Sequence, residues 1–291
     1  MTSPACYPWW HREYAPLLSS KAATTTLSSG CAVNAQGNIP CNPEAMRAKA
    51  EQQLHAFGVN LRLSLETYTL ARYMQGEVGS GTLEERVAVG EAAVNRAKLW
   101  KLPMGVLSLL LFRQPEGHPN RGWYGPIHGV GTGVETAPYG RWATTSKDPT
   151  VLTTLLADLV MSGRSDNFSR HADDQAGPEH WIPRGQTALH NYVRRIASEG
   201  RYWVGPLPGV DHWHTFLQWT PSKLQRAALG QAGLDALVAR GLDALTLPRQ
   251  KIEWGDLPIC GRPASTFGLI ATTVLGVTAG VWAFRRFADP V

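Results

Sequence analysis

The spacing of apolar residues between positions 61 and 99 predicts two helices separated by a glycine-rich break. Apolar side chains recur at helical intervals from Leu65 to Met74, which is typical of one buried helix face. Gly76 is expected to end this helix, and Gly79-Ser80-Gly81 to keep the chain open. Thr82 should then cap a second helix, with a glutamate three residues later in a capping box. The pattern places Glu77 just beyond a helix C-terminus, beside a glycine-rich loop.

Further stretches of the chain also have helical spacing. Asn42-Pro43-Glu44 places a capping residue and an N-terminal proline before a helix that should run to about Phe57 and stop at Gly58. Asp148-Pro149-Thr150 precedes a helix whose leucines share one face and which Gly163 should end. The remaining expected helices cover residues 83–96, 103–112 and 186–199. Together they predict a mainly α-helical domain over residues 44–204.

The segments on either side of this domain differ from it in composition. Residues 1–43 are predicted to be irregular, because Pro4, Pro8 and Pro16 interrupt them and small polar residues follow. Residues 205–263 are predicted to be a connector rich in Pro and Trp that includes a small helical segment.

The C-terminal end of the chain has the composition of a membrane span. No charged residue occurs from Ser265 to Phe284, and about 20 residues cross a hydrocarbon core as a helix. We therefore predict a transmembrane helix over residues 264–286, with a buried core helix as the alternative. Arg285-Arg286 suit an interfacial anchor. Gly276 and Gly280 form a Gly-x-x-x-Gly pair, which favours helix–helix self-association.

The predicted anchor raises a question of topology. The N-terminus has no charged start followed by an apolar stretch, so no signal peptide is predicted. The two C-terminal arginines favour an external domain, whereas ordinary insertion of a C-terminal anchor leaves the domain in the cytosol. A phage protein reconciles the two, because it can reach the cell wall from a virion or wait in the cytosol for host lysis. We therefore predict a membrane-anchored protein of a virion or of the host cell envelope.

The charged residues favour an anionic target. The net charge is +5, from 28 Lys and Arg against 23 Asp and Glu, which suits the negative polymers and lipids of a cell envelope. Nucleic acid is not a predicted partner, because the chain has no run of Lys or Arg and no nucleic-acid motif.

Neither the cysteines nor the histidines form a recognisable metal motif. The four cysteines, Cys6, Cys31, Cys41 and Cys260, fit no zinc spacing, and a Cys31–Cys41 bridge and unpaired structural cysteines are both open. Two clusters combine His with Asp, namely His171 with Asp173 and Asp174, and Asp211-His212-Trp213-His214. No His-Glu-x-x-His is present. No metal or other cofactor is predicted, and a metal-dependent amidase is kept as a minor alternative.

The position of Glu77 suggests acid–base chemistry. The partial negative charge of a helix C-terminus disfavours an ionised carboxylate, and apolar neighbours such as Tyr73 and Met74 disfavour it further. Both effects raise the pKa of a carboxyl group, which a general acid needs at neutral pH. The simpler interpretation is that Glu77 is a solvated loop carboxylate.

The block from Leu70 to Arg96 also carries a series of motifs in a fixed order. They are Leu70-Ala71-Arg72, Gly76-Glu77, Val87-Ala88-Val89, Ala93-Val94 and Asn95-Arg96. This series resembles the cell wall hydrolase family of the SleB/CwlJ type, the spore-cortex-lytic enzymes. The resemblance implies a lysozyme-like fold, cleavage of peptidoglycan glycan strands, and Glu77 as the essential acid. It also implies a structural role for Asn95-Arg96. A looser likeness extends to Trp181, where the family's Phe-Asn-Pro is absent.

Aromatic residues supply candidates for sugar binding, because indole and phenol faces stack on sugar rings. Some lie in the Gly- and Pro-rich residues 113–149, a length without regular structure that is usually functional or disordered. The alternative for each is packing within the protein. The candidate substrate-binding residues are Tyr73, Trp123, Tyr124, Phe168, Trp181 and Tyr192.

The prediction is a membrane-anchored enzyme that cleaves peptidoglycan glycan strands, serving phage entry or host lysis. Glu77 would protonate the glycosidic oxygen. The product is then a reducing end if a second carboxylate positions water, or a 1,6-anhydro end if Glu77 next acts as a base on the 6-hydroxyl. The sequence shows no convincing second acid, and the resemblance favours the lytic transglycosylase. The competing hypothesis is a non-enzymatic virion membrane or penetration protein that binds glycan through a degenerate lysozyme-like domain.

Overall fold

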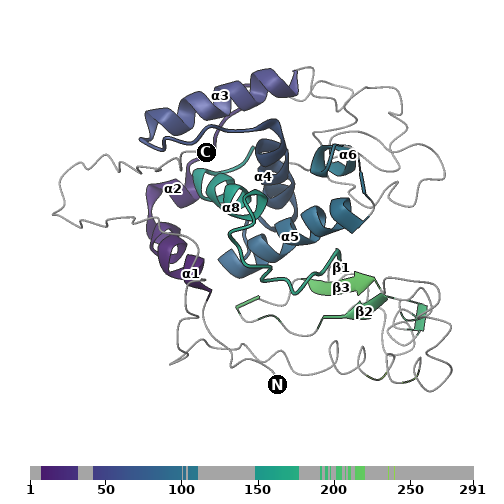
Figure 1. Ribbon diagram of the computed structural model, residues 1–291. Helices are drawn as coiled ribbons and strands as arrows, with labels where there is room; N and C mark the ends of the chain where they lie inside the picture. The colour runs from purple at the N-terminus through teal and green to yellow at the C-terminus, as the bar shows by residue number, and fades with distance from the viewer. Residues whose placement is uncertain are drawn as a thin grey trace, which may run out of the picture.

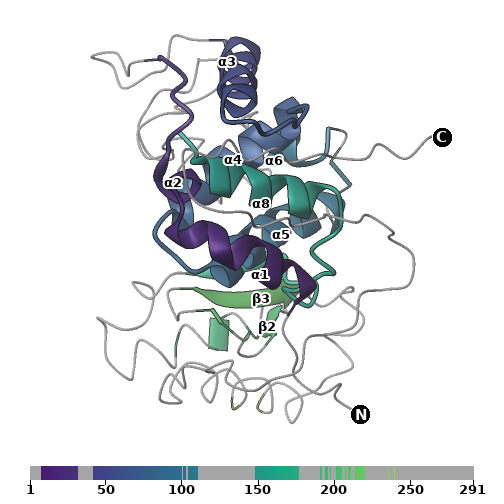
Figure 2. The ribbon, with the colours of Figure 1, turned by 90° about the vertical axis from the view of Figure 1, so that its left-hand side faces the viewer.

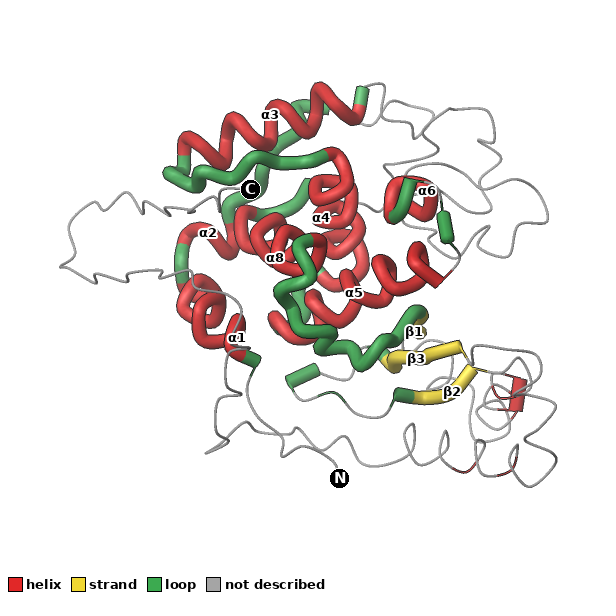
Figure 3. Tube along the Cα trace, in the orientation of Figure 1, coloured by secondary structure: helices red, strands yellow, loops and turns green. Residues whose placement is uncertain are grey.

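The computed structural model describes residues 8–31, 42–99, 101–102, 104–110, 148–176, 201–204 and 214–219, together with single residues between 191 and 239. Over these residues the protein is mainly α-helical, as predicted (Figure 3). The helices pack around one another, and a small three-stranded sheet lies beside them (Figure 1).

Three helices form the centre of the fold. They are α4 (Leu65–Val78), α5 (Leu83–Leu99) and α8 (Val151–Met161), and each packs against the other two. A short helix, α6 (Val106–Leu110), packs against α4 and α5 within the predicted range 103–112. Nearly every face of α8 is apolar, which is typical of a helix buried among other helices. The central helices therefore account for most of the hydrophobic core.

The helix α4 extends further than its sequence predicts. It continues through Gly76 and Glu77 to Val78, so Gly76 does not end it. A glycine inside a helix costs about 1 kcal/mol relative to alanine, and here the following turn is held by hydrogen bonds that offset this cost. Glu77 consequently lies within the last helical turn rather than beyond it.

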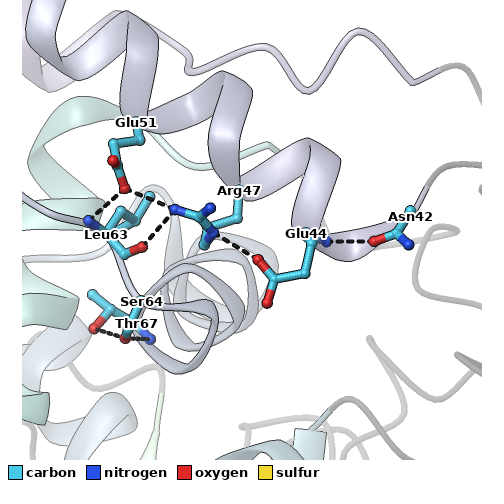
Figure 4. A network of polar contacts seen from close by, with 7 residues as sticks. All are labelled: Asn42, Glu44, Arg47, Glu51, Leu63, Ser64 and Thr67. Carbon is cyan, nitrogen blue, oxygen red and sulfur yellow. Dashed lines mark hydrogen bonds and ion pairs between the residues drawn. The ribbon is translucent and has the colours of Figure 1, made fainter.

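The helix α3 (Pro43–Ala56) confirms the predicted start at Asn42, whose side chain accepts a hydrogen bond from the Glu44 amide at 2.8 Å. Gly58 follows the helix with φ +77°. Arg47 donates to the Leu63 carbonyl at 2.9 Å, while Glu51 accepts from the Leu63 amide at 2.8 Å (Figure 4). The backbone N–H and C=O of Leu63 are thus both hydrogen-bonded, which fixes the path of the chain just before α4.

The N-terminal segment is not irregular, contrary to the prediction for residues 1–43. Residues 9–24 contain α1 (Trp9–Tyr14), the 3-10 helix η1 (Ala15–Ser19) and α2 (Lys21–Thr24). The prolines that suggested interruption stand where helices tolerate them, because Pro8 precedes α1 and Pro16 occupies the first turn of η1. Figure 2 shows this segment running alongside α8 and α5.

Asp148 joins this segment to the central helices. Its carboxylate accepts from the Ser29 amide at 2.9 Å and from the Ser29 hydroxyl at 3.0 Å, and it also pairs with the buried guanidinium of Arg72 on α4. Cys31, at the end of the segment, is disulfide-bonded to a cysteine outside the described residues. Residues 8–31 are therefore part of the folded domain.

The sheet consists of β1 (Asp174–Ala176), β2 (Arg201–Trp203) and β3 (Thr215–Trp219), in the antiparallel order β1-β3-β2. The predicted domain boundary at residues 204 and 205 falls between two paired strands. Residues 215–219 therefore belong to the same folded unit as β1, and describing them as connector was wrong.

Some predictions concern residues that the structure does not describe. Among the described residues, no helix has the length and apolar character needed to cross a membrane. The predicted span at 264–286, with Gly276 and Gly280, lies outside the described residues, as does most of the predicted helix at 186–199.

Candidate functional site

Glu77 lies in the last turn of α4 and is partly exposed. The chain then turns, because the Gly81 amide donates to the Val78 carbonyl at 2.8 Å. Thr82 begins α5 as predicted, and its hydroxyl accepts from the Glu85 amide at 3.2 Å. Hydrogen bonds thus fix both ends of the loop between α4 and α5. Glu77 lies just before this loop, and only Val78 separates the two.

Arg86 fixes the glycine-rich loop from inside the protein. Its guanidinium donates to the Gly79 carbonyl at 2.7 Å, to the Gly81 carbonyl at 3.1 Å and to the hydroxyl of Thr153 at 3.2 Å. The side chain is buried, and desolvation lowers the pKa of the guanidinium, opposed by the charge of Glu85. Arg86 supplies donors to carbonyls that the end of α4 leaves without helical partners.

The last turn of α4 is also tied to the start of α8. Gln75 accepts through Oε1 from the hydroxyl of Thr153 at 2.7 Å and from the amide of Thr150 at 3.4 Å. Thr150 in turn caps α8, since its hydroxyl accepts from the Thr153 amide at 3.1 Å. The backbone that carries Glu77 is therefore held from two directions.

A carboxylate–imidazole pair lies directly behind the loop. Glu85 is 0% exposed, and its Oε1 is 2.8 Å from Nδ1 of His214. Its other oxygen, Oε2, is buried without a hydrogen-bond partner among the described residues. A Cβ at Gly81 would lie only 2.6 Å from Oε2. The carboxylate of Glu85 thus binds His214, which is not the partner that a capping box provides.

The neighbouring residue, Glu84, faces another histidine. Nε2 of His11, on α1, lies 3.0 Å from Oε1 of Glu84, which is 4% exposed. Burial raises the pKa of Glu84 to about 7, opposed by a hydrogen bond to its own backbone. Burial also lowers the pKa of His11. Both shifts favour the uncharged forms of the two groups.

A side chain of the sheet reaches the face of α4 that leads to Glu77. The Tyr73 hydroxyl accepts from Nε2 of Gln175 at 2.9 Å. Gln175 on β1 pairs with Phe216 on β3, two residues after His214. Since residues four apart share a helix face, Glu77 follows Tyr73 by one turn on the side of α4 that meets these strands.

Two predicted sugar-binding residues take part in packing. Tyr73 is 2% exposed, so its ring has no open face for a sugar. Phe168 is partly buried and packs edge-to-face with Trp10, the ring centroids 5.4 Å apart. The other four, Trp123, Tyr124, Trp181 and Tyr192, lie outside the described residues or have side chains that are not described.

Glu91 was not predicted to have a role of its own, yet it organises the chain before β1. Its carboxylate, 4% exposed, accepts from the amides of Phe168 at 3.0 Å and Ser169 at 2.6 Å. Burial raises the pKa of Glu91, and these hydrogen bonds oppose the rise. Asn95 donates to the Ala172 carbonyl at 2.9 Å, which gives it the structural role that the resemblance implied.

Within the part of the chain that the structure describes, no three His, Cys, Asp or Glu side chains are grouped so as to hold a metal ion. Comparison with known proteins adds no relative, since no family model, no curated protein and no solved structure matches this chain. The resemblance to the SleB/CwlJ type therefore stays a prediction from residues 70–96.

Proposed function

We propose that this protein cleaves the glycan strands of peptidoglycan with Glu77 as the general acid, in a lysozyme-like domain. The observation that supports the proposal is the placement of Glu77. It is a partly exposed carboxylate in the last turn of a buried helix, which Gln75 ties to α8, next to a loop that Arg86 holds by hydrogen bonds. A rigid mount of this kind is what an acid needs in order to meet one atom of a substrate.

In the proposed reaction the carboxyl proton of Glu77 passes to the oxygen between two sugars. The bond between that oxygen and the anomeric carbon breaks, and the bonding electrons stay on the oxygen. Water can then add to the anomeric carbon while one of its protons passes to the ionised Glu77, which gives a reducing end and restores the acid. Alternatively the 6-hydroxyl of the same sugar can add, giving a 1,6-anhydro end, and its proton returns to Glu77. General acid catalysis contributes about 10²–10⁴-fold to such a reaction.

The proposed setting is a membrane-anchored protein of a virion or of the host envelope, with the anchor at residues 264–286. Support comes from the uncharged stretch between Ser265 and Phe284 and from the arginines that follow it. Self-association through Gly276 and Gly280 is part of the same proposal.

The test is digestion of purified peptidoglycan by the full-length protein, with mass analysis of the products. Glu77→Gln keeps the shape of the side chain and removes the acid. Glu66→Gln, three helical turns earlier on α4 and also partly exposed, is the matched control. We expect Glu77→Gln to lose at least about 100-fold in rate and Glu66→Gln to match the wild type.

The products distinguish the alternatives. Anhydro ends indicate a lytic transglycosylase, and reducing ends indicate a hydrolase. Equal cleavage by wild type and Glu77→Gln would remove Glu77 from the mechanism. No cleavage by the wild type, with retained binding to glycan, would favour the non-enzymatic virion protein. Loss of cleavage with a chelator, and cut amide bonds in the products, would favour a metal-dependent amidase.

A further inference from the structure

We propose that His214 binds the glycan substrate at the Glu77 site and that Glu85 is the residue that positions it. The inference rests on the proposed function and adds to it a second polar side chain, which the sequence did not reveal. It begins from the pair itself, in which Nδ1 of His214 lies 2.8 Å from Oε1 of a fully buried carboxylate.

The hydrogen bond to Glu85 determines what His214 offers on its other side. A carboxylate only accepts hydrogen bonds, so Nδ1 carries the hydrogen and donates it. In the neutral imidazole, Nε2 is then an acceptor. No described residue bonds to Nε2, and this atom is not among the buried atoms that lack partners. His214 therefore presents an acceptor that a ligand can reach.

Glu85 is a buried ionisable group whose hydrogen bonding among the described residues is incomplete. Its carboxylate is 0% exposed, yet only one of its oxygens is hydrogen-bonded among the described residues. Burying an ionisable group with incomplete hydrogen bonding is costly, and such groups are concentrated at functional sites. A carboxylate behind a histidine is also a recurrent way of fixing the orientation and tautomer of an imidazole.

The pair is close to Glu77 along two routes. Through the loop, Glu85 lies against Gly81, which bonds to Val78, the residue after Glu77. Through the sheet, His214 immediately precedes β3, and β3 pairs with the strand that bonds to Tyr73. The segment before His214 is anchored at the same place, because the Thr82 hydroxyl donates to the Gly209 carbonyl at 2.8 Å. The end of the sheet and the end of α4 thus meet at the glycine-rich loop.

The ligand chemistry follows from the free acceptor. N-acetylated sugar strands present hydroxyl and amide hydrogens at every residue, and a neutral imidazole nitrogen accepts a hydrogen bond from either. We infer that Nε2 of His214 holds one sugar of the strand while Glu77 protonates the neighbouring glycosidic oxygen. Glu85 acts only through His214 and does not touch the substrate.

The decisive variant is His214→Asn in the full-length protein. The asparagine amide can donate to Glu85 in place of Nδ1 but has no atom in the place of Nε2. His171→Asn is the matched control, because His171 is exposed and its backbone, with φ +64°, suits asparagine. We expect His214→Asn to keep the wild-type melting temperature and to lose about tenfold in kcat/KM, the value of one hydrogen bond. We expect His171→Asn to change neither quantity.

The outcomes separate this inference from the proposed function. If the wild type cleaves and Glu77→Gln does not, while His214→Asn equals the wild type in kcat/KM, His214 has only a structural role and the inference is overturned. If the wild type does not cleave at all, the proposed function and the inference fail together.

A second measurement needs no variant and applies even if His214→Asn does not fold. The nitrogen signals of the His214 ring are followed by NMR while an N-acetylglucosamine tetramer is added to the wild type. We expect the Nε2 signal of His214 to shift and the signals of His171 to stay in place. An unchanged Nε2 signal at saturating tetramer would overturn the inference.

Discussion

Glu84 and Glu85 are neighbours in the first turn of α5, and each faces a histidine from a distant part of the chain. Glu84 faces His11, from the N-terminal segment, whereas Glu85 faces His214, the residue before β3. At Glu84, the carboxyl oxygen Oε1 lies 3.0 Å from Nε2 of His11, and burial lowers the pKa of that imidazole. The contact of Glu85 is a hydrogen bond of 2.8 Å to a fully buried carboxylate.

The first turn of α5 thus contacts two distant segments of the chain, and the two contacts have different consequences. At Glu84 the two groups favour their uncharged forms, and their contact joins the N-terminal segment to α5. At Glu85 the imidazole is oriented and keeps an accessible nitrogen. We therefore expect changes on the Glu84 side to affect stability, and changes on the Glu85 side to affect activity as well.

The largest effect should come from Trp10, which anchors the N-terminal side. Its ring is 0% exposed, and its indole nitrogen donates to the Ser165 carbonyl at 3.2 Å. Trp10→Ala should reduce the free energy of unfolding by about 3–5 kcal/mol, because it leaves a large cavity. Urea unfolding followed by circular dichroism measures this, with the partly buried Trp9→Ala as the control.

The same variant tests the division between the two sides. At a temperature where Trp10→Ala remains folded, its kcat/KM on peptidoglycan should equal that of the wild type. A loss of stability below about 1 kcal/mol, the size of a surface change, would show that residues 8–31 are not part of the cooperative core.

A smaller effect should come from the titration of Glu84. Its pKa rises from 4.5 in the unfolded chain to about 7 in the folded protein, so folding takes up a proton between these values. The stabilising contribution is complete below about pH 4.5 and is lost as the pH rises through 7. Glu84→Gln, a neutral isostere, should therefore be more stable than the wild type at pH 8 by about 1–3 kcal/mol.

Urea unfolding from pH 4.5 to pH 8 checks this expectation. The difference between Glu84→Gln and the wild type should shrink to nearly zero at the acid end. His11 works in the opposite direction, because its lowered pKa makes the folded state less stable as the pH falls below 6.5. The wild type and Glu84→Gln share this loss of stability at acid pH, so it cancels in the difference between them. A difference that does not vary with pH would contradict the assignment, and exposed Glu44→Gln controls for the loss of one charge.

The sequence predicted the central helices well because their signals are local. Apolar spacing identified α4, α5 and α8, and the caps predicted at Asn42 and Thr82 are confirmed. The end of α4 was misplaced, because Gly76 looked like a terminator while the donors of Arg86 extend the ordered structure past it. A hydrogen bond from a side chain on the next helix is not a local signal.

The rest of the site depends on contacts between distant residues. His11 is 73 residues from Glu84, and His214 is 129 residues from Glu85, so no spacing rule links either pair. The strand β3 was missed within a segment rich in Pro and Trp, although Thr215–Trp219 has the Thr and aromatic content of strands. Had the strand been recognised, His214 would have been placed beside a sheet rather than in a connector.

The smallest effect should come from Gly81, and it bears directly on the Glu85 side. An added Cβ would lie 2.6 Å from Glu85 Oε2 and 3.2 Å from the Val78 carbonyl oxygen. Gly81→Ala should cost about 1 kcal/mol, because the carboxylate must move, and that movement weakens its hold on His214. Gly163→Ala is a useful contrast, since its added Cβ would have no neighbour within 4 Å and its cost comes only from φ +70°.

A double-mutant cycle shows which group an added Cβ at Gly81 collides with. In a Glu85→Ala background the carboxylate is gone, so Gly81→Ala should cost much less there than in the wild type, with a coupling of about 0.5–1 kcal/mol. Equal costs in both backgrounds would mean that the Val78 carbonyl, and not Glu85, limits the space. Because the shifted carboxylate misplaces His214, Gly81→Ala should also lower kcat/KM, whereas Gly163→Ala should leave it unchanged. That pairing separates a change in the site from a general loss of stability.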